Sequence, residues 1–254
     1  MRVDIEPAFD FTAAEFSRLF ERSGATAFQH PVWLQAFYRD WAPKRGAQPI
    51  IVTGRCSSAG LCFVLPLILR RISITSLLES ADFGVSDYAA PIVDRQWWEA
   101  FEDRDTLVEQ IARKLPPYDI LRIKPVRPEH LALWRAFLPG ESRGLGFNAH
   151  ATPVAGPMES WREGAFSRSF ARMLARKRKR FFRSADAKLV VLEEPVAITQ
   201  ALSKIAQWRS GRFAEDIIQD PAALNFYRSV AVAGAAAKST RTYALEVGDD
   251  AVGY

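Results

Sequence analysis

The stretch AQPIIVTGRCSSAGLCFVLPLILRR, residues 47–71, decides the fold of the first part of the chain. It contains two β-branched and apolar runs, residues 47–54 and 61–71, separated by a turn region bounded by Gly54 and Gly60. Runs of this kind on either side of a glycine-containing turn are typical of paired strands. We therefore predict an antiparallel strand pair here.

The segments on both sides of this strand pair predict more helices and strands. Residues 15–22 and 31–41 have apolar side chains at helical spacing, and Pro31 occupies a suitable first helical position. Pro116 and Pro117 end a longer amphipathic pattern, because proline cannot continue a helix. Downstream of the pair, the patterns predict strands at 74–80, 91–94 and 118–125 and helices at 96–115 and 127–138.

A Gly- and Pro-rich segment, residues 139–157, is the best linker candidate, although residues 146–154 within it also fit a strand between lobes. The same order of helices followed by strands then begins again. It predicts helices at 168–185, 197–211 and 221–237, strands at 188–194 and 240–247, and the start of another strand in 248–254. We expect a mixed α/β fold of two related lobes, residues 1–150 and 151–254, each with a mixed, largely antiparallel sheet flanked by helices.

The positive charge of the chain is concentrated in one segment. Residues 1–150 contain 18 Lys and Arg against 18 Asp and Glu, whereas residues 151–254 contain 16 against 11. Residues 168–188 alone contain nine basic side chains and only one acidic side chain, Asp186. A dedicated nucleic-acid domain usually spreads its basic residues over several elements, so this distribution disfavours nucleic acid as the partner.

On a helical projection the basic segment is amphipathic. One side carries Phe170, Met173, Leu174, Phe181 and Ala185, and another carries Arg172, Arg176, Lys179, Arg180 and Arg183. The basic side could bind the phosphates of coenzyme A, an anionic glycan or lipid carrier, or a nucleic acid. The alternative is that it is only exposed to solvent and binds no partner.

Several classes of protein are excluded or disfavoured. No apolar run reaches the ~18 residues that span a bilayer, and the N-terminal residues do not resemble a secretion signal, so we expect a cytoplasmic protein. Cys56 and Cys62 are too few for a disulfide framework or a zinc site, and we expect reduced thiols. The three histidines lie far apart in the sequence, and we expect no metal site.

Seven stretches, in this order along the chain, resemble the CelD-type, BioF2-like acyltransferases of the GNAT superfamily, whose architecture is similar to that of FemAB enzymes with tandem GNAT-like lobes. The stretches are FQHPVWLQAFYRDW, GLCFVLPLILRR, FGVSDYAAPIVD, YDILRI, LARKRKRFFRSADAKLVVLEE, IAQWRSGRF and FYRSVA. The resemblance runs from about Phe28 to Tyr254. It implies transfer of an acyl group from acetyl-CoA or another acyl-CoA to an amine or hydroxyl of a sugar, glycan precursor or amino acid, in polysaccharide or cell-envelope biosynthesis.

The chain departs from that superfamily at the pyrophosphate-binding loop, Gln/Arg-x-x-Gly-x-Gly/Ala. The nearest stretch, residues 141–146, begins with Glu141 and lies in the linker. From this we expect that the second lobe is incomplete and that the chain is truncated after Tyr254. The missing loop also suggests a catalytically silent scaffold for exopolysaccharide assembly as an alternative. The basic run from Arg176 to Arg180 suggests another, a basic binder of nucleic acid or a membrane surface.

Acyl transfer requires a group that takes the proton of the acceptor and a donor for the oxyanion or the departing thiolate. Asp87 and Tyr88 supply a carboxylate and a phenol and are candidates for catalysis and acceptor binding, although Ser-Asp pairs also cap turns. Tyr227 is a further phenol, with a place in the core as the alternative. Candidates for acceptor binding are Trp208, Arg209 and Arg212, and candidates for cofactor binding are Arg176, Lys177, Lys179 and Arg180. The arginines at 209 and 212 equally suit the C-terminal end of a helix dipole.

Overall fold

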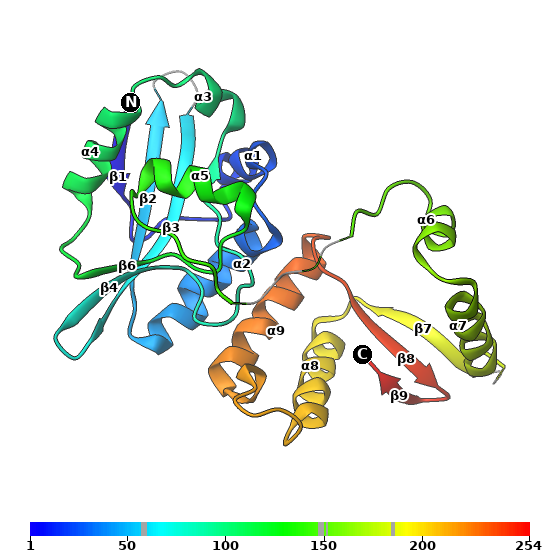
Figure 1. Cartoon of the computed structure of the whole chain (residues 1–254). Helices are drawn as coiled ribbons and strands as arrows, with labels where there is room; N and C mark the ends of the chain where they lie inside the picture. The colour runs from blue at the N-terminus through cyan, green and yellow to red at the C-terminus, as the bar shows by residue number, and fades with distance from the viewer. Residues whose placement is uncertain (57–59, 147–149, 151, 184–185) are drawn as a thin grey trace.

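A computed structural model describes residues 1–56, 60–146, 150, 152–183 and 186–254 of the chain. These residues form two separate sheets, each flanked by helices (Figure 1). The expected mixed α/β class is therefore confirmed.

The first sheet has the strand order β1-β2-β3-β4-β6, with β5 paired to β3. Its neighbours are antiparallel except β4 and β6, which run parallel. The strands are β1 (Arg2–Ile5), β2 (Gln48–Cys56), β3 (Gly60–Ile72), β4 (Thr75–Ser80), β5 (Ile92–Val93) and β6 (Ile120–Arg122). The strand pair predicted within residues 47–71 is thus confirmed as β2 and β3.

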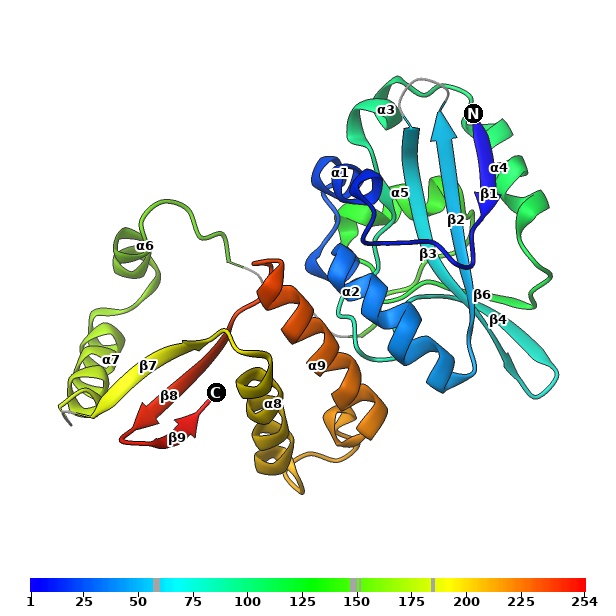
Figure 2. The same ribbon diagram turned by 180° about the vertical axis from the view of Figure 1, so that it is seen from behind.

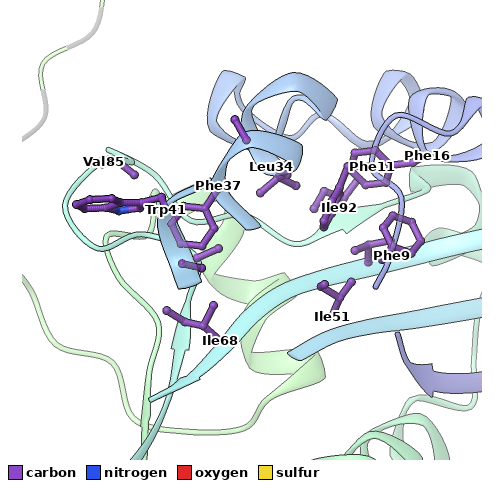
Figure 3. Close-up of a cluster of buried hydrophobic side chains, with 14 of the residues drawn as sticks. Phe9, Phe11, Phe16, Leu34, Phe37, Trp41, Ile51, Ile68, Val85 and Ile92 are labelled. Atoms are coloured by element: carbon purple, nitrogen blue, oxygen red, sulfur yellow. The ribbon is translucent and has the colours of Figure 1, made fainter. Parts of the chain in front are cut away.

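Strand β3 is buried on both faces, with every residue from Leu61 to Ile68 inaccessible to solvent. Side chains alternate between the faces of a strand, so each face needs its own apolar cover. Val64 and Ile68 join one core cluster (Figure 3), and Phe63 and Leu65 join the other. The helices α1 (Ala14–Ser23) and α2 (Pro31–Ala36) cover the first cluster, and α4 (Arg104–Lys114) and α5 (Pro128–Phe137) cover the second.

Helix α2 continues as the π-helical turn η2 (Phe37–Trp41) and the 3₁₀ turn η3 (Ala42–Arg45), and the short 3₁₀ turn η1 (Ala27–Gln29) precedes it. The prediction of one continuous helix over residues 96–115 is wrong. Two helices replace it, α3 (Arg95–Ala100) and α4, because Phe101 adopts an extended backbone. The ring of Phe101 lies 4.8 Å from that of Trp97, and both pack against the second core cluster. Tertiary burial of an aromatic ring therefore overrides the local helical pattern.

The second sheet contains β7 (Ala187–Leu192), β8 (Thr242–Val247) and β9 (Asp250–Gly253) in that order, all antiparallel. Its helices are α6 (Met158–Ala165), α7 (Arg168–Phe181), α8 (Pro195–Arg209) and α9 (Pro221–Ala236), with the 3₁₀ turn η4 (Ile217–Gln219) between the last two. Predicted strands 188–194 and 240–247 are confirmed. The predicted basic helix ends at Phe181, and Ala185 lies outside the described residues, as do residues 147–149 and 151 of the strand considered within 146–154. The described residues of that stretch are not in a strand.

Helix α9 connects the two parts of the molecule, because it packs along α2 and η2 (Figure 2). Phe226 is fully buried in the first core cluster, with ring centroids 5.1 Å from Trp33 and 6.5 Å from Phe37. Arg45 and Asp220 form an ion pair of 3.3 Å at the start of α9. The second part of the chain therefore completes the core of the first, and the domain boundary near residue 150 stays a prediction.

The expectation of reduced thiols is wrong, since the structure joins Cys56 and Cys62 by a disulfide. The antiparallel register of β2 and β3 places Arg55 opposite Leu61 and brings the two cysteine Cα atoms to 6.3 Å. That separation lies within the range that a disulfide spans. Within the described part of the chain, no helix has the length and apolar character of a membrane-spanning segment.

Replacing Phe226 by Ala tests whether α9 is part of the first core. We expect the free energy of unfolding to fall by about 3–5 kcal/mol, because a fully buried ring is lost and a cavity remains. Urea denaturation monitored by circular dichroism measures this change. Phe213→Ala is the matched control, because Phe213 is 58% exposed and its loss leaves no cavity. Equal effects of the two variants would contradict the shared core.

His30 makes stability depend on pH. The Val32 amide donates to its Nδ1 over 3.2 Å at the start of α2, and burial lowers the pKa of His30. The folded state therefore favours the neutral imidazole. The contribution of His30 to the free energy of unfolding is fully present above the unfolded-state pKa of about 6.5, and it is lost as the pH falls from that value toward the lower pKa of the folded state. We expect His30→Asn, which retains a capping oxygen, to reduce the difference in Tm between pH 7.5 and pH 5. An unchanged difference would contradict this assignment.

Candidate functional site

The loop of residues 81–90, between β4 and β5, holds the first group of candidate residues. Asp82 fixes its shape, because one carboxylate oxygen accepts hydrogen bonds from the amides of Gly84 (3.0 Å) and Ser86 (3.2 Å). The indole of Trp33 donates to the Ser86 hydroxyl over 3.2 Å and ties the loop to α2. The loop is thereby held between the sheet and the helix layer.

The same loop meets the second part of the chain at Gly84. This residue has a left-handed φ of +79°, which glycine adopts without strain. A Cβ atom built here would lie 3.3 Å from Cδ1 of Ile217 in η4. Any larger side chain at position 84 would therefore press against η4, and the two segments lie in close approach.

We call this approach of the loop of residues 81–90 to η4 and the start of α9 the junction; Asp87 lies in the loop and Tyr227 on α9. Tyr227 lies on α9, half-buried, with its ring centroid 6.3 Å from that of Trp33. Its pKa is raised above the usual 10, first by burial and then by the negative charges of Asp87, Asp216 and Asp82. The phenol therefore keeps its proton at neutral pH and is available as a hydrogen-bond donor. Asp87 is exposed and has no ion-pair partner among the residues that the structure describes.

Arg209, at the end of α8, is held by a bidentate ion pair with Asp216. The Nε and Nη2 atoms of Arg209 lie 2.8 and 3.0 Å from the two carboxylate oxygens, and the Asp216 side chain is only 4% exposed. Arg209 lowers the pKa of Asp216, mainly through this hydrogen bond. The guanidinium also lies over the ring of Phe213. Arg209 thus closes the turn between α8 and η4 and is not a free anion clamp in this arrangement.

The other acceptor-binding candidates, Trp208, Arg212 and Tyr88, make separate contacts. Trp208 stacks on Tyr254 with a centroid distance of 5.3 Å. Arg212 is exposed, and its backbone amide donates to the carbonyl of Arg209. The ring of Tyr88 packs edge-on against Phe28 at 6.0 Å and beneath the Arg127 guanidinium at 5.3 Å.

The cofactor-binding candidates lie on α7, where Arg176, Lys177, Lys179 and Arg180 are all exposed. Figure 1 shows α7 at the opposite end of the second part from α9. The structure therefore brings together Asp87, Tyr227 and Arg209, and it does not bring the α7 side chains to them.

A cavity of about 190 Å³ adjoins the loop. Glu79 lines it and is 6% exposed, held by Arg70 at 2.9 Å and by Arg122 at 2.7 Å. Burial raises the pKa of Asp82, which also lines this cavity. Lys124 is a lining cation with no ion pair among the described residues. A larger cavity of about 570 Å³ lies between the end of α1, α3 and α5.

Two acidic residues of the junction, Asp82 and Asp216, were missed in the sequence. Asp82 stands two residues before Gly84, a spacing typical of a side-chain-capped turn, and this pattern was available. Asp216 has no comparable local signal, because its role depends on Arg209 across a turn. The described residues contain no group of three or more His, Cys, Asp or Glu side chains placed to hold a metal ion.

Comparison with known proteins supports one class of domain. Residues 168–254 match the family model described as acetyltransferase (GNAT) domain. No curated protein and no solved structure matches the chain. The match covers α7 to β9, including Arg209, Asp216 and Tyr227, and it supports acyl transfer from acyl-CoA as the general chemistry.

Proposed function

We propose that the chain is a GNAT-type acyltransferase that uses acetyl-CoA or another acyl-CoA as donor and an amine as acceptor. The observation that carries this proposal is the match of residues 168–254 to the GNAT acetyltransferase domain. The ordered resemblance of the whole chain supports the narrower relation to the CelD-type, BioF2-like enzymes, with FemAB-like tandem lobes and an acceptor from polysaccharide or envelope biosynthesis.

The charges at the junction favour an amine over a hydroxyl acceptor. Asp82, Asp87 and Asp216 all raise the pKa of Tyr227. Asp216 is paired with Arg209, and Lys124 acts on Asp82, which leaves the exposed carboxylate of Asp87 without a cation among the described residues. An unpaired carboxylate attracts an ammonium ion more strongly than a neutral alcohol. In this proposal, the exposed carboxylate of Asp87 holds that ammonium.

In the proposed reaction, Asp87 takes a proton from the acceptor ammonium, and the free nitrogen attacks the thioester carbonyl. The nitrogen of the tetrahedral intermediate loses its second proton to solvent, and the intermediate collapses to the amide with cleavage of the C–S bond and release of the thiolate. The Tyr227 phenol donates a hydrogen bond to the oxyanion or to the departing sulfur. Because its raised pKa makes it a weaker acid than a thiol, the phenol keeps its proton, and the thiolate is protonated from solvent.

Binding of acetyl-CoA to the 254-residue chain is the first test. We expect calorimetric titration to give a micromolar Kd, with circular dichroism confirming that the chain is folded. ATP is the control, because it is a polyanion that the basic α7 attracts without any acyl-CoA pocket. A folded chain that binds acetyl-CoA no better than ATP would contradict the proposal and favour a silent scaffold role, which the absence of Gln/Arg-x-x-Gly-x-Gly/Ala in the matched residues already motivates.

Turnover tests the junction itself. Release of free thiol from acetyl-CoA is followed with ethanolamine, glucosamine and L-lysine as probe amines. We expect Tyr227→Phe to lower kcat by roughly 100-fold, since one oxyanion donor is lost, without changing the Kd of acetyl-CoA. We expect Asp87→Asn to lower kcat/KM by at least about 100-fold, as loss of a proton acceptor does.

Tyr118→Phe is the matched control, because Tyr118 is exposed just before β6 and far from α9 in sequence. Full activity of both junction variants would place the chemistry elsewhere in the chain. Activity with hydroxyl acceptors that exceeds activity with the amines would contradict the acceptor class.

A further inference from the structure

Helix α7 has an excess of positive charge that nothing in the described structure neutralises. Between Arg168 and Arg183 there are eight Lys and Arg side chains and no Asp or Glu. None of them forms an ion pair with any residue that the structure describes. Arg172, Arg176 and Lys179 share one side of the helix, which is exposed along its length. Seven of these charges lie within the roughly 21 Å of α7 itself, and this density is a strong attraction for a multivalent anion.

The opposite side of α7 is apolar and is not fully buried either. Phe170 on this side is 43% exposed, and no residue of the helix reaches full burial. Phe182, which directly follows the helix, is 44% exposed. Aromatic contacts continue this surface onto α6, with centroid distances of 5.5 Å from Trp161 to Phe166 and 5.1 Å from Phe166 to Phe170. Figure 1 shows α6 and α7 extending away from the second sheet.

The basic side and the apolar side of α7 together indicate which kind of partner the helix binds. A nucleic acid or a soluble polyanion would neutralise the basic side and leave the aromatic side in water. An anionic phospholipid surface satisfies both, since its headgroups pair with Lys and Arg and its acyl boundary accepts Phe and Trp. Lys177, which projects between Met173 and Phe181, has a stem long enough to keep its ammonium among the headgroups.

We propose that α6 and α7 form a peripheral membrane-binding element that lies in the plane of an anionic phospholipid surface. The inference is independent of acyl transfer, because none of its residues belongs to the junction of Asp87 and Tyr227. It would place the reaction of the chain beside a membrane, within reach of acceptors that are attached to lipids.

Co-sedimentation of the full chain with vesicles tests this proposal. We expect binding to vesicles of 70% phosphatidylcholine and 30% phosphatidylserine, weakening as salt rises, and little binding to pure phosphatidylcholine. The variant Arg176→Gln/Lys179→Gln/Arg180→Gln is expected to bind roughly 100-fold more weakly, at a factor of about five per basic residue. The matched control Lys44→Gln/Arg71→Gln/Lys204→Gln removes the same charge from exposed residues outside α7 and is expected to bind like the original chain.

A second variant separates a lipid surface from other anions. Phe170→Ser/Phe182→Ser keeps every basic residue, and we expect it to weaken vesicle binding by at least about ten-fold, since apolar insertion is lost. Unchanged vesicle binding by this variant, or duplex DNA binding tighter than vesicle binding, would overturn the proposal in favour of a plain polyanion site. The proposal would also be overturned if the two triple variants lost vesicle binding to the same extent, or if the original chain bound pure phosphatidylcholine vesicles as tightly as vesicles that contain phosphatidylserine.

Discussion

Burial of strand β3 on both faces is the constraint on which the rest of the structure depends. Eight consecutive residues, Leu61 to Ile68, are shielded from water, so the sheet needs a helical layer on each side. One layer is local, because α4 and α5 follow the strands that they cover. The other includes Phe226, which arrives from far along the chain and packs against Trp33. The same indole holds Ser86 in the loop of Asp87, so the core and the candidate site share one anchor.

Much of the fold could be predicted because its signals are local. The strand pair of residues 47–71 and the alternation of helices and strands follow from runs of apolar residues and from glycine and proline. The interruption between α3 and α4 at Phe101 could not be predicted, because it depends on the packing of the Phe101 ring against a cluster that forms only when the chain folds. The disulfide of Cys56 and Cys62 was missed for a similar reason: the strand register, not the number of cysteines, brings the two residues together.

The candidate site shows the same limit. Residue chemistry and the family resemblance singled out Asp87, and residue chemistry suggested Tyr227. These residues are 140 positions apart in the sequence, yet in the structure the charge of Asp87 contributes to the raised pKa of Tyr227. Their proximity depends on the docking of α9, which no local pattern encodes. Conversely, Arg209 looked like a free guanidinium in the sequence and is held by Asp216 in the fold. Long-range packing decides which charged groups remain available for chemistry.

The contribution of α9 to the first core also affects how the protein is made. Phe226 leaves the ribosome about 190 residues after Phe37, which corresponds to roughly 10–40 s at ordinary rates of synthesis. During that interval the α2 side of the first sheet lacks part of its cover, while α1, α2 and the strands are already available to fold. The nascent chain therefore passes through a stage with exposed aromatic surface, of the kind that molecular chaperones recognise.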